Sequence, residues 1–441
     1  MELIIPAIKT AAGICGRQKL QEGQSCRLSR HCVSLMTEEG TLFYHVLTGA
    51  LVLMPGQEIT ENDRRVLTEN WFYVPEDFHE EQFVDEVRRI AGMMTPPAKH
   101  RTSFTVLPTT DCNARCFYCY EIGIRRFSMS PETAHDTAEY IRKASGGEAV
   151  RIRWFGGEPL YNREAIDIIC TELGRGGTEY ESGMVSTGYY MDEETVKKAV
   201  QLWHLKEIQI TVDGTEKIYN RTKAYIDADA NPFERVMKHI GLLLAARVGV
   251  TVRLNMDARN ADDLLVLAED ISRRFAGCPN ARAYVALLHD FTGKIHRFDT
   301  QKEILMKYRA TCDKLKEHGM LRQKKLPRQI RLNCCMADDD ASETILPDGR
   351  IGRCEHYSET MITGDIRSGE RNEAVAQQWK ERFSSPECAE CALYPICNRL
   401  KMCEWNRDGC TEADREIRMA ELKEQMLDAL REYRERKGEE K

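Results

Sequence analysis

The sequence lacks an apolar run long enough to cross a membrane. A membrane helix needs about 20 apolar residues, and the longest candidate, residues 240–252, is interrupted by Arg247. The sequence also lacks the pattern of a signal peptide, because its second residue is Glu2 and no basic region precedes the first apolar residues. We therefore expect a cytoplasmic protein rather than a membrane or secreted one.

The sequence has no excess of positive charge either. Its 63 Lys and Arg residues are outnumbered by 70 Asp and Glu residues, which gives a formal net charge of −7. Binding to nucleic acid or to an anionic membrane depends on clustered cations, so we expect neither partner. The 42% hydrophobic and 30% charged content is typical of a soluble globular protein. At roughly 100–200 residues per domain, 441 residues accommodate two or three domains.

Cysteine is too sparse for a disulfide scaffold, since 17 of 441 residues is well below the roughly 8–10% of small secreted scaffolds. Its distribution is uneven, with three cysteines between 112 and 119 and a second group between 334 and 410. Clustered thiols in a reducing compartment are more often metal ligands or catalytic groups than bridges. We interpret the scattered cysteines as small buried hydrophobes or inert thiols; they are Cys15, Cys26, Cys32, Cys170, Cys278 and Cys312.

Residues 1–98 resemble a separate small α+β unit in their pattern. Two β-rich runs within residues 32–54 surround a turn-forming Glu-Glu-Gly and predict a hairpin. Helical spacing of apolar positions follows within residues 60–74 and 76–94. The proline pair in residues 95–100 then predicts a linker.

Residues 99–300 alternate strand-like runs with amphipathic helical segments. Six repeats of strand and helix predict an α/β fold with a parallel sheet, an open or partial (β/α)6 barrel. Ligands of such folds gather at the carboxyl ends of the strands, and every suggestive motif of this region falls at such an end. The predicted strands are residues 103–109, 150–155, 183–187, 207–213, 250–256 and 283–288.

The first strand is followed by three closely spaced cysteines, Cys112, Cys116 and Cys119. They could form a disulfide with one thiol left over, an incomplete zinc site, or three corners of an iron–sulfur cluster. Structural zinc needs four closed ligands, and no fourth Cys or His is adjacent. A cubane held by three thiolates leaves one iron without a protein ligand, which is useful only if another molecule coordinates there.

This spacing resembles the radical S-adenosylmethionine (radical SAM) enzymes, which carry it in the loop after the first strand. An aromatic residue precedes the last cysteine in that family, and here it is Tyr118. The resemblance implies a [4Fe–4S] cluster whose open iron chelates the amino and carboxylate groups of S-adenosylmethionine (AdoMet). Reductive cleavage of AdoMet then gives a 5′-deoxyadenosyl radical that abstracts hydrogen from an unactivated carbon, while the protein supplies binding and orientation.

The end of the second strand carries a motif that resembles the family's segment for the cofactor's amino group. Glycine permits a close approach of the backbone there, and the glutamate can accept a hydrogen bond from the ammonium group. The alternative for this segment is an ordinary turn. The residues are Gly156, Gly157, Glu158 and Pro159.

Later strands end in motifs that also match the family. Ser186 and Thr187 lie where relatives read Ser-Thr-Asn-Gly, and the resemblance implies a ribose or carboxylate contact, although the Asn is missing here. We expect Asp213 of "TVDG", as a catalytic residue, and Arg253 of "VRLN", as a cofactor-binding residue, to face the cavity, with a purely structural role as the alternative for either.

Residues 301–441 contain the second cysteine group and resemble the SPASM extension of radical SAM enzymes, a cysteine-rich iron–sulfur domain. The one departure is the spacing from Cys397 to Cys403, with five intervening residues where the family has three. The resemblance implies two auxiliary [4Fe–4S] clusters. The first would use Cys335, Cys354 and Cys403, with Cys334 as a possible fourth ligand, and the second Cys388, Cys391, Cys397 and Cys410.

Glu355 directly follows Cys354. Sulfatase-maturating relatives use an Asp near this place to deprotonate the substrate, so we expect Glu355 to be a general base; an ordinary solvated glutamate is the alternative. The C-terminal residues 412–441 predict a charged amphipathic helix that packs against its own domain.

SPASM enzymes mostly modify peptides, and residues 1–98 resemble the leading region of maturases that act on ribosomally made precursors. We therefore expect a precursor peptide substrate, a thioether or other cross-link as the product, and an external low-potential donor of the flavodoxin or ferredoxin type. An added strand at a hairpin edge is one way to bind a leader peptide. The alternatives are a sulfatase-type maturase that makes formylglycine, and a non-catalytic iron–sulfur or zinc-binding electron-transfer protein.

Overall fold

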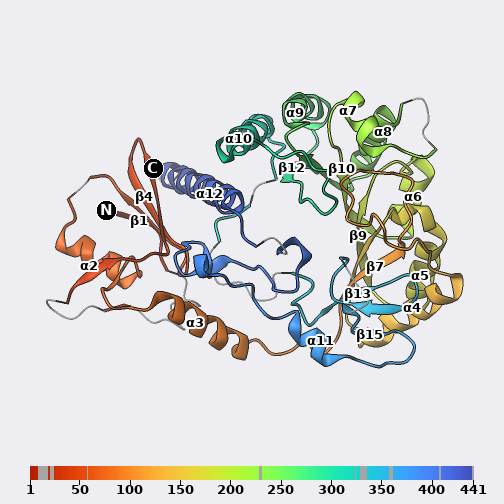
Figure 1. Ribbon diagram of the computed structural model, residues 1–441, viewed down its shortest axis with the longest axis horizontal. Coiled ribbons are helices and arrows are strands. Elements are labelled where there is room, and N and C mark those ends of the chain that lie inside the picture. Colours follow the sequence, from red (N-terminus) through yellow and green to blue (C-terminus); the bar gives the residue numbers. More distant parts are fainter. Residues whose placement is uncertain are drawn as a thin grey trace. The chain divides into compact units, whose positions relative to one another are not determined.

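The computed structural model in Figure 1 describes most of the chain. It divides into two compact units that do not follow chain order, which we name the central unit and the terminal unit. The central unit comprises Ala98–Arg322 and Asp339–Lys380, and the terminal unit comprises Met1–Pro97, Gln323–Asp338 and Glu381–Lys441. The described residues are 1–7, 18–19, 24–56, 58–227, 231–322, 324–327, 335–356, 361–406 and 409–439.

The central unit contains a largely parallel sheet, which confirms the predicted α/β class. All six predicted strands are present and pair in parallel in sequence order, with bounds shifted by at most three residues. Within the described residues the sheet is open rather than a closed barrel, because β15 and β12 form its two edges. The strands are β7 (Ser103–Thr109), β8 (Val150–Gly156), β9 (Tyr180–Ser186), β10 (Leu205–Thr211), β11 (Gly249–Met256) and β12 (Ala281–Leu287).

Three further strands extend this sheet beyond β7. The strand β13 (Ser342–Ile345) pairs with β7 in parallel, and β14 (Arg350–Gly352) and β15 (Gly364–Asp365) follow in antiparallel pairing. The sheet therefore takes in part of the sequence that we had assigned to residues 301–441. This addition brings the segment after β14, with Cys354 and Glu355, into the same unit as the first cysteine loop.

Most helices of the central unit bury one apolar face, although α11 (Glu373–Gln378) buries no residue. In α4 (Pro131–Ala144), the Ser130 side chain accepts a hydrogen bond from the Thr133 amide at the N-terminus, and Ala134, Ala138 and Ile141 are buried. The others are α5 (Arg163–Arg175), α6 (Glu193–Gln201), α7 (Glu216–Lys223), α8 (Pro232–Ala245), α9 (Ala261–Phe275), α10 (Gln301–Glu317), α11 (Glu373–Gln378) and the 3-10 turn η1 (Pro159–Asn162).

The terminal unit is built on a four-stranded antiparallel sheet in the order β1-β5-β4-β3. The predicted hairpin forms between β3 (Cys32–Thr37) and β4 (Gly40–His45), and β5 (Ala50–Met54) continues it. Gly40 has a φ of +132°, and a Cβ there would collide with the Met54 carbonyl, so the turn requires glycine. The remaining elements are β1 (Glu2–Ile5), β2 (Cys26–Leu28), β6 (Tyr73–Pro75), α2 (Glu61–Glu69) and α3 (Glu80–Met94).

The long C-terminal helix α12 (Glu412–Glu439) packs on this sheet of N-terminal residues. Its Leu422, Met426 and Leu430 form one buried cluster with Leu42 and Leu53 of the sheet. Three short 3-10 turns precede α12: η3 (Pro386–Cys388), η4 (Tyr394–Ile396) and η5 (Glu404–Asn406). The two ends of the chain therefore share one hydrophobic core. No helix within the described residues is long and apolar enough to span a membrane.

Candidate active site

The loop after β7 carries Cys112, Cys116 and Cys119, as the sequence predicted. The Cys112 amide donates to Asp111 Oδ1 at 2.8 Å, and the Cys119 amide donates to the Cys116 carbonyl at 3.2 Å. Burial raises the pKa of Cys119 to about 12 and also raises the pKa values of Cys112 and Cys116. Metal coordination deprotonates a thiol, so metal binding at this loop would release protons.

The glycine pair after β8 packs against the start of this cysteine loop. Gly156 has a φ of +113°, and a Cβ there would collide with the Thr109 carbonyl oxygen, as a Cβ on Gly157 would with the Asp111 carbonyl oxygen. The Gly157 amide donates to the Thr109 carbonyl at 3.2 Å, and the Glu158 amide donates to the Asp111 carbonyl at 2.9 Å. At both glycines, the close neighbour is therefore the backbone of the chain itself. These contacts fix the position at which the cysteine loop begins.

Glu158 is fully buried, and its carboxylate accepts four hydrogen bonds from the protein. Oε1 accepts from the Leu160 amide at 3.1 Å and the Ser186 hydroxyl at 2.8 Å. Oε2 accepts from the amide and the hydroxyl of Thr187, both at 2.7 Å. A carboxylate has about four acceptor sites, so this one is saturated. Burial raises the pKa of Glu158, while the hydrogen bonds oppose that shift. Pro159 then begins η1.

Asp213 lies two residues beyond β10 and is fully buried. Its Oδ2 is 2.9 Å from the Lys223 ammonium nitrogen, and the Tyr118 hydroxyl donates to its two oxygens at 2.8 and 2.9 Å. The Asn260 side chain holds the same position by donating to the Asp213 carbonyl at 2.8 Å. The sequence pattern indicates Asp213 and Tyr118 but not Lys223, because a lysine on a polar helix carries no local signal.

Arg253 on β11 donates to Asn255 Oδ1 at 2.8 Å. Its charge is close to His356, whose pKa is lowered to about 4, first by burial and then by Arg253. The His356 ring stacks on Tyr120, with ring centroids 3.6 Å apart. The stack joins the residue that follows Cys119 to the loop that carries Glu355, and the Cys354 thiol lies 3.7 Å from Glu355 Oε2.

The second cysteine group is divided between the two units. Cys354 belongs to the central unit, and Cys334 lies outside the described residues, as does Cys15. The other predicted ligands all belong to the terminal unit; they are Cys335, Cys388, Cys391, Cys397, Cys403 and Cys410.

Residues of the N-terminal region hold the segment that carries Cys388, Cys391 and Cys397. Arg88 of α3 donates to the carbonyls of Tyr394 and Cys397, and its guanidinium carbon lies 4.3 Å from the Tyr394 ring centroid. The Tyr394 hydroxyl donates to Asp85 Oδ1 at 2.6 Å. The two cysteines Cys388 and Cys391 pack beside buried side chains of the same helix. The N-terminal region is thus a support for the cysteine segment, which the sequence analysis did not predict.

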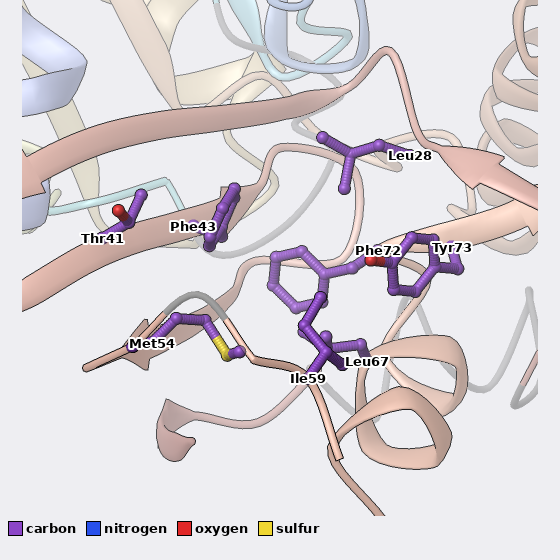
Figure 2. Close-up of a pocket in the computed structure, with 9 residues that line it drawn as sticks. Leu28, Thr41, Phe43, Met54, Ile59, Leu67, Phe72 and Tyr73 are labelled. Atoms are coloured by element: carbon purple, nitrogen blue, oxygen red, sulfur yellow. The ribbon is translucent and has the colours of Figure 1, made fainter. Parts of the chain in front are cut away.

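The terminal unit also contains an apolar pocket of about 200 Å³, between the sheet and α2 (Figure 2). Leu28 and Ile59, each 45% exposed, lie at this pocket, and Phe72 is fully buried in it. A pocket of this size accommodates a large apolar side chain, since an engineered cavity of about 150 Å³ holds benzene. Its other lining residues are Thr41, Phe43, Met54, Gly56, Leu67 and Tyr73.

Comparison with known proteins identifies part of the central unit. The family model of the radical SAM superfamily matches residues 106–271, which begin in β7 and end in α9. The chain contains a radical SAM domain. The match spans the cysteine loop, the glycine pair, Glu158, Asp213 and Lys223. The contacts among these residues therefore belong to that domain. No curated protein matches the sequence.

Solved structures resemble a larger part of the chain. Native anSMEcpe with bound AdoMet is 15% identical with a TM-score of 0.57, and the match covers 76% of this chain and 99% of that one. SuiB from Streptococcus suis is 12% identical with a TM-score of 0.53, over 86% of this chain and 96% of that one. SuiB bound to its precursor peptide SuiA gives 13% identity and a TM-score of 0.50, over 87% and 96%. At these identities the likeness establishes the fold.

A radical SAM domain implies AdoMet and a [4Fe–4S] cluster, and the donor set fits the cluster. Three thiols on one short loop are the soft ligands that iron–sulfur clusters take. Within the described residues, however, no three His, Cys, Asp or Glu side chains converge on a point that could hold a single metal ion. Two observations therefore support the cluster: the three thiol donors on one loop, and the backbone contacts that hold the start of that loop.

Proposed function

We propose that the protein is a radical SAM peptide maturase, which installs a thioether or another cross-link in a cysteine-rich precursor peptide. The observation that carries this proposal is the apolar pocket of the terminal unit, which lies outside the radical SAM domain and fits a side chain of a peptide. The fold likeness to SuiB, one structure of which holds its precursor peptide, supports a substrate of this class.

Most of the predicted residues have a role in this proposal. When bound, the cluster and AdoMet supply hydrogen abstraction through a 5′-deoxyadenosyl radical. Cys112, Cys116 and Cys119 would ligate that cluster, and an external low-potential donor of the flavodoxin or ferredoxin type would reduce it. The ends of the strands would position AdoMet through Tyr118, Gly156, Gly157, Glu158, Pro159, Ser186, Thr187 and Arg253.

The auxiliary cysteines would hold two further [4Fe–4S] clusters. The first would use Cys335, Cys354 and Cys403, with Cys334 as a possible fourth ligand. We assign Glu355 as the base that takes the proton of a substrate thiol, because the thiolate is the reactive form. Its carboxylate oxygen Oε2 lies 3.7 Å from the Cys354 thiol, and this proximity supports the assignment. The second cluster would use Cys388, Cys391, Cys397 and Cys410.

A sulfatase-type maturase is the second candidate, because anSMEcpe matches over 99% of its own length. The products of a cysteine-containing peptide distinguish the two reactions. A thioether cross-link removes two hydrogen atoms and keeps the sulfur, whereas formylglycine formation replaces the thiol by an aldehyde and loses the sulfur.

The deciding experiment incubates the anaerobically reconstituted chain with reductant, AdoMet and synthetic cysteine-containing precursor peptides. We expect slow formation of 5′-deoxyadenosine without peptide and a peptide product without loss of sulfur. Absence of 5′-deoxyadenosine would favour the non-catalytic electron-transfer alternative. Formation of 5′-deoxyadenosine with every peptide left unmodified would overturn the peptide substrate.

The contribution of the pocket is tested by substitution rather than by deletion of residues 1–98, because deletion would expose the apolar face of α12. Ile59→Asp places a charge at the pocket, at a side chain that is 45% exposed. We expect slower peptide modification with unchanged cleavage of AdoMet. Met36→Asp, at a residue that is 86% exposed and does not line the pocket, is the matched control.

A further inference from the structure

Lys223 is a buried cation that the proposed chemistry does not yet use. Its side chain is 3% exposed and that of its partner Asp213 is 1% exposed, with Nζ and Oδ2 separated by 2.9 Å. Burial opposes the charged form of Lys223, but Asp213 and then Tyr118 outweigh it and raise the lysine pKa well above its ordinary value. Forming a buried ion pair costs desolvation free energy. We therefore expect this pair, which lies beside the cysteine loop, to have a function.

The pair is linked to the cysteine loop through its side chains and through its backbone. The Tyr118 hydroxyl donates to both oxygens of Asp213. The Lys223 carbonyl accepts from the Arg115 amide at 2.7 Å. The chain turns directly afterwards, because Ala224 has a left-handed φ of +43°.

A third link follows this turn. The Ile226 amide donates to the Asn113 carbonyl at 2.9 Å, and Asn113 is itself 1% exposed. The cysteine loop is therefore attached at Asn113, Arg115 and Tyr118, which are distributed between its first and last cysteine. A loop held at three points has few conformations left, so its thiols are preorganised.

We propose that Lys223 and Asp213 are positioning residues that hold the loop from Cys112 to Cys119 in the conformation that ligates the cluster. This inference rests on the proposed role of the three cysteines and does not depend on the peptide substrate. It adds Lys223 to the functional residues, and it gives Asp213 the role of holding the loop that would ligate the cluster.

The test measures, in the reconstituted full-length chain, the rate at which a chelator removes iron from the cluster whose electron paramagnetic resonance signal changes on addition of AdoMet. Tyr118→Phe leaves the ion pair intact and removes one anchor. We expect iron loss to become roughly 10- to 100-fold faster, as for other outer-shell partners of metal ligands. Lys223→Gln removes the ion pair but keeps a donor for Asp213, and iron loss should again become faster.

Two further variants complete the design. Lys198→Met is the matched control, because it removes the more exposed Lys198–Asp167 pair of the same 2.9 Å length, and we expect iron loss at the wild-type rate. The double variant Lys223→Met with Asp213→Asn removes the ion pair and should also lose iron faster. It leaves no uncompensated buried charge, which guards against misfolding.

The possible results separate the two proposals. The inference is wrong if Tyr118→Phe retains iron as long as the wild type, or if Lys223→Gln and the double variant lose iron no faster than the control. A wild-type chain without any cluster that responds to AdoMet would overturn the assignment of the three cysteines as well. If the variants lose iron as expected but the wild-type chain leaves every peptide unmodified, only the proposed peptide substrate is overturned.

Discussion

At the scale of single residues, Glu158 illustrates how structure refines a motif. The sequence indicates an acceptor for the ammonium group of AdoMet, and the structure shows a carboxylate whose acceptor sites are already filled by Leu160, Ser186 and Thr187. Because these donors end or follow neighbouring strands, Glu158 joins β8 to β9 at the edge where ligands bind. Its influence on AdoMet would therefore include the order it imposes on Ser186 and Thr187.

Glu158→Gln should weaken AdoMet binding. The amide keeps the shape of the side chain but replaces one acceptor oxygen by a donor, which would face the donors of Thr187 or Ser186. We expect a loss of about 1.5–3 kcal/mol, the range for a hydrogen bond to a charged group. Equilibrium binding of AdoMet to the reconstituted chain measures it, with the more exposed Glu172→Gln as control. An affinity equal to that of the wild type would show that Glu158 neither contacts nor shapes the site.

Glu355→Gln tests the proposed base. The substitution removes the proton acceptor and keeps the size, so peptide product should form at least about 100-fold more slowly, the lower end of general-base catalysis. Iron content and 5′-deoxyadenosine formation without peptide should persist, because the cysteine loop is unchanged. A decrease of less than about tenfold would instead indicate that coordination by iron deprotonates the substrate thiol.

At the scale of secondary-structure elements, α3 is the least expected participant. It belongs to the N-terminal region, yet Arg88 donates to carbonyls of the segment that carries Cys391 and Cys397, 309 residues further along the chain in the case of Cys397. The backbone around ligating cysteines must be fixed for the thiols to converge. We therefore infer that α3 would support the proposed second auxiliary cluster.

Arg88→Met should prevent that cluster from assembling. Methionine keeps much of the apolar stem but cannot donate to the Tyr394 and Cys397 carbonyls, so about four irons of one cubane should be lost on reconstitution. Arg89→Met is the control, because Arg89 lies on the same helix, is 59% exposed and pairs only with Glu86 among the ion pairs of the described residues. Equal iron content in the two variants would refute a supporting role for α3.

At the scale of the whole molecule, the three separable cysteine groups predict a total metal content. Iron and sulfide analysis of the reconstituted chain should give about twelve of each, from three cubanes of four. Alanine at Cys112, Cys116 and Cys119 together should remove about a third of the iron, since each cubane contributes equally. Two clusters or fewer in the intact protein would contradict the two auxiliary clusters.

The stability of the terminal unit should depend on pH through His45. Burial and then the charge of His31 lower the His45 pKa to about 3, whereas an unfolded histidine titrates near about 6.5. The unfolded chain therefore binds a proton first as the pH falls, so stability is lost below about pH 6.5, approaching about 1.4 kcal/mol per pH unit. Urea titrations should show a weaker pH dependence for His45→Gln, and an identical dependence would contradict a neutral buried His45.

The sequence by itself determined the six parallel strands and the cysteine spacing, because both are local. Strand patterns report which face is buried, and three cysteines within eight residues share a loop whatever surrounds them. The tertiary structure decided the partners. The apolar stripe of α12 shows only that a face is covered, and the fold supplies the N-terminal sheet as its cover. Likewise Lys223 gains a role only where folding places it 2.9 Å from Asp213, since no local pattern encodes contacts between distant side chains.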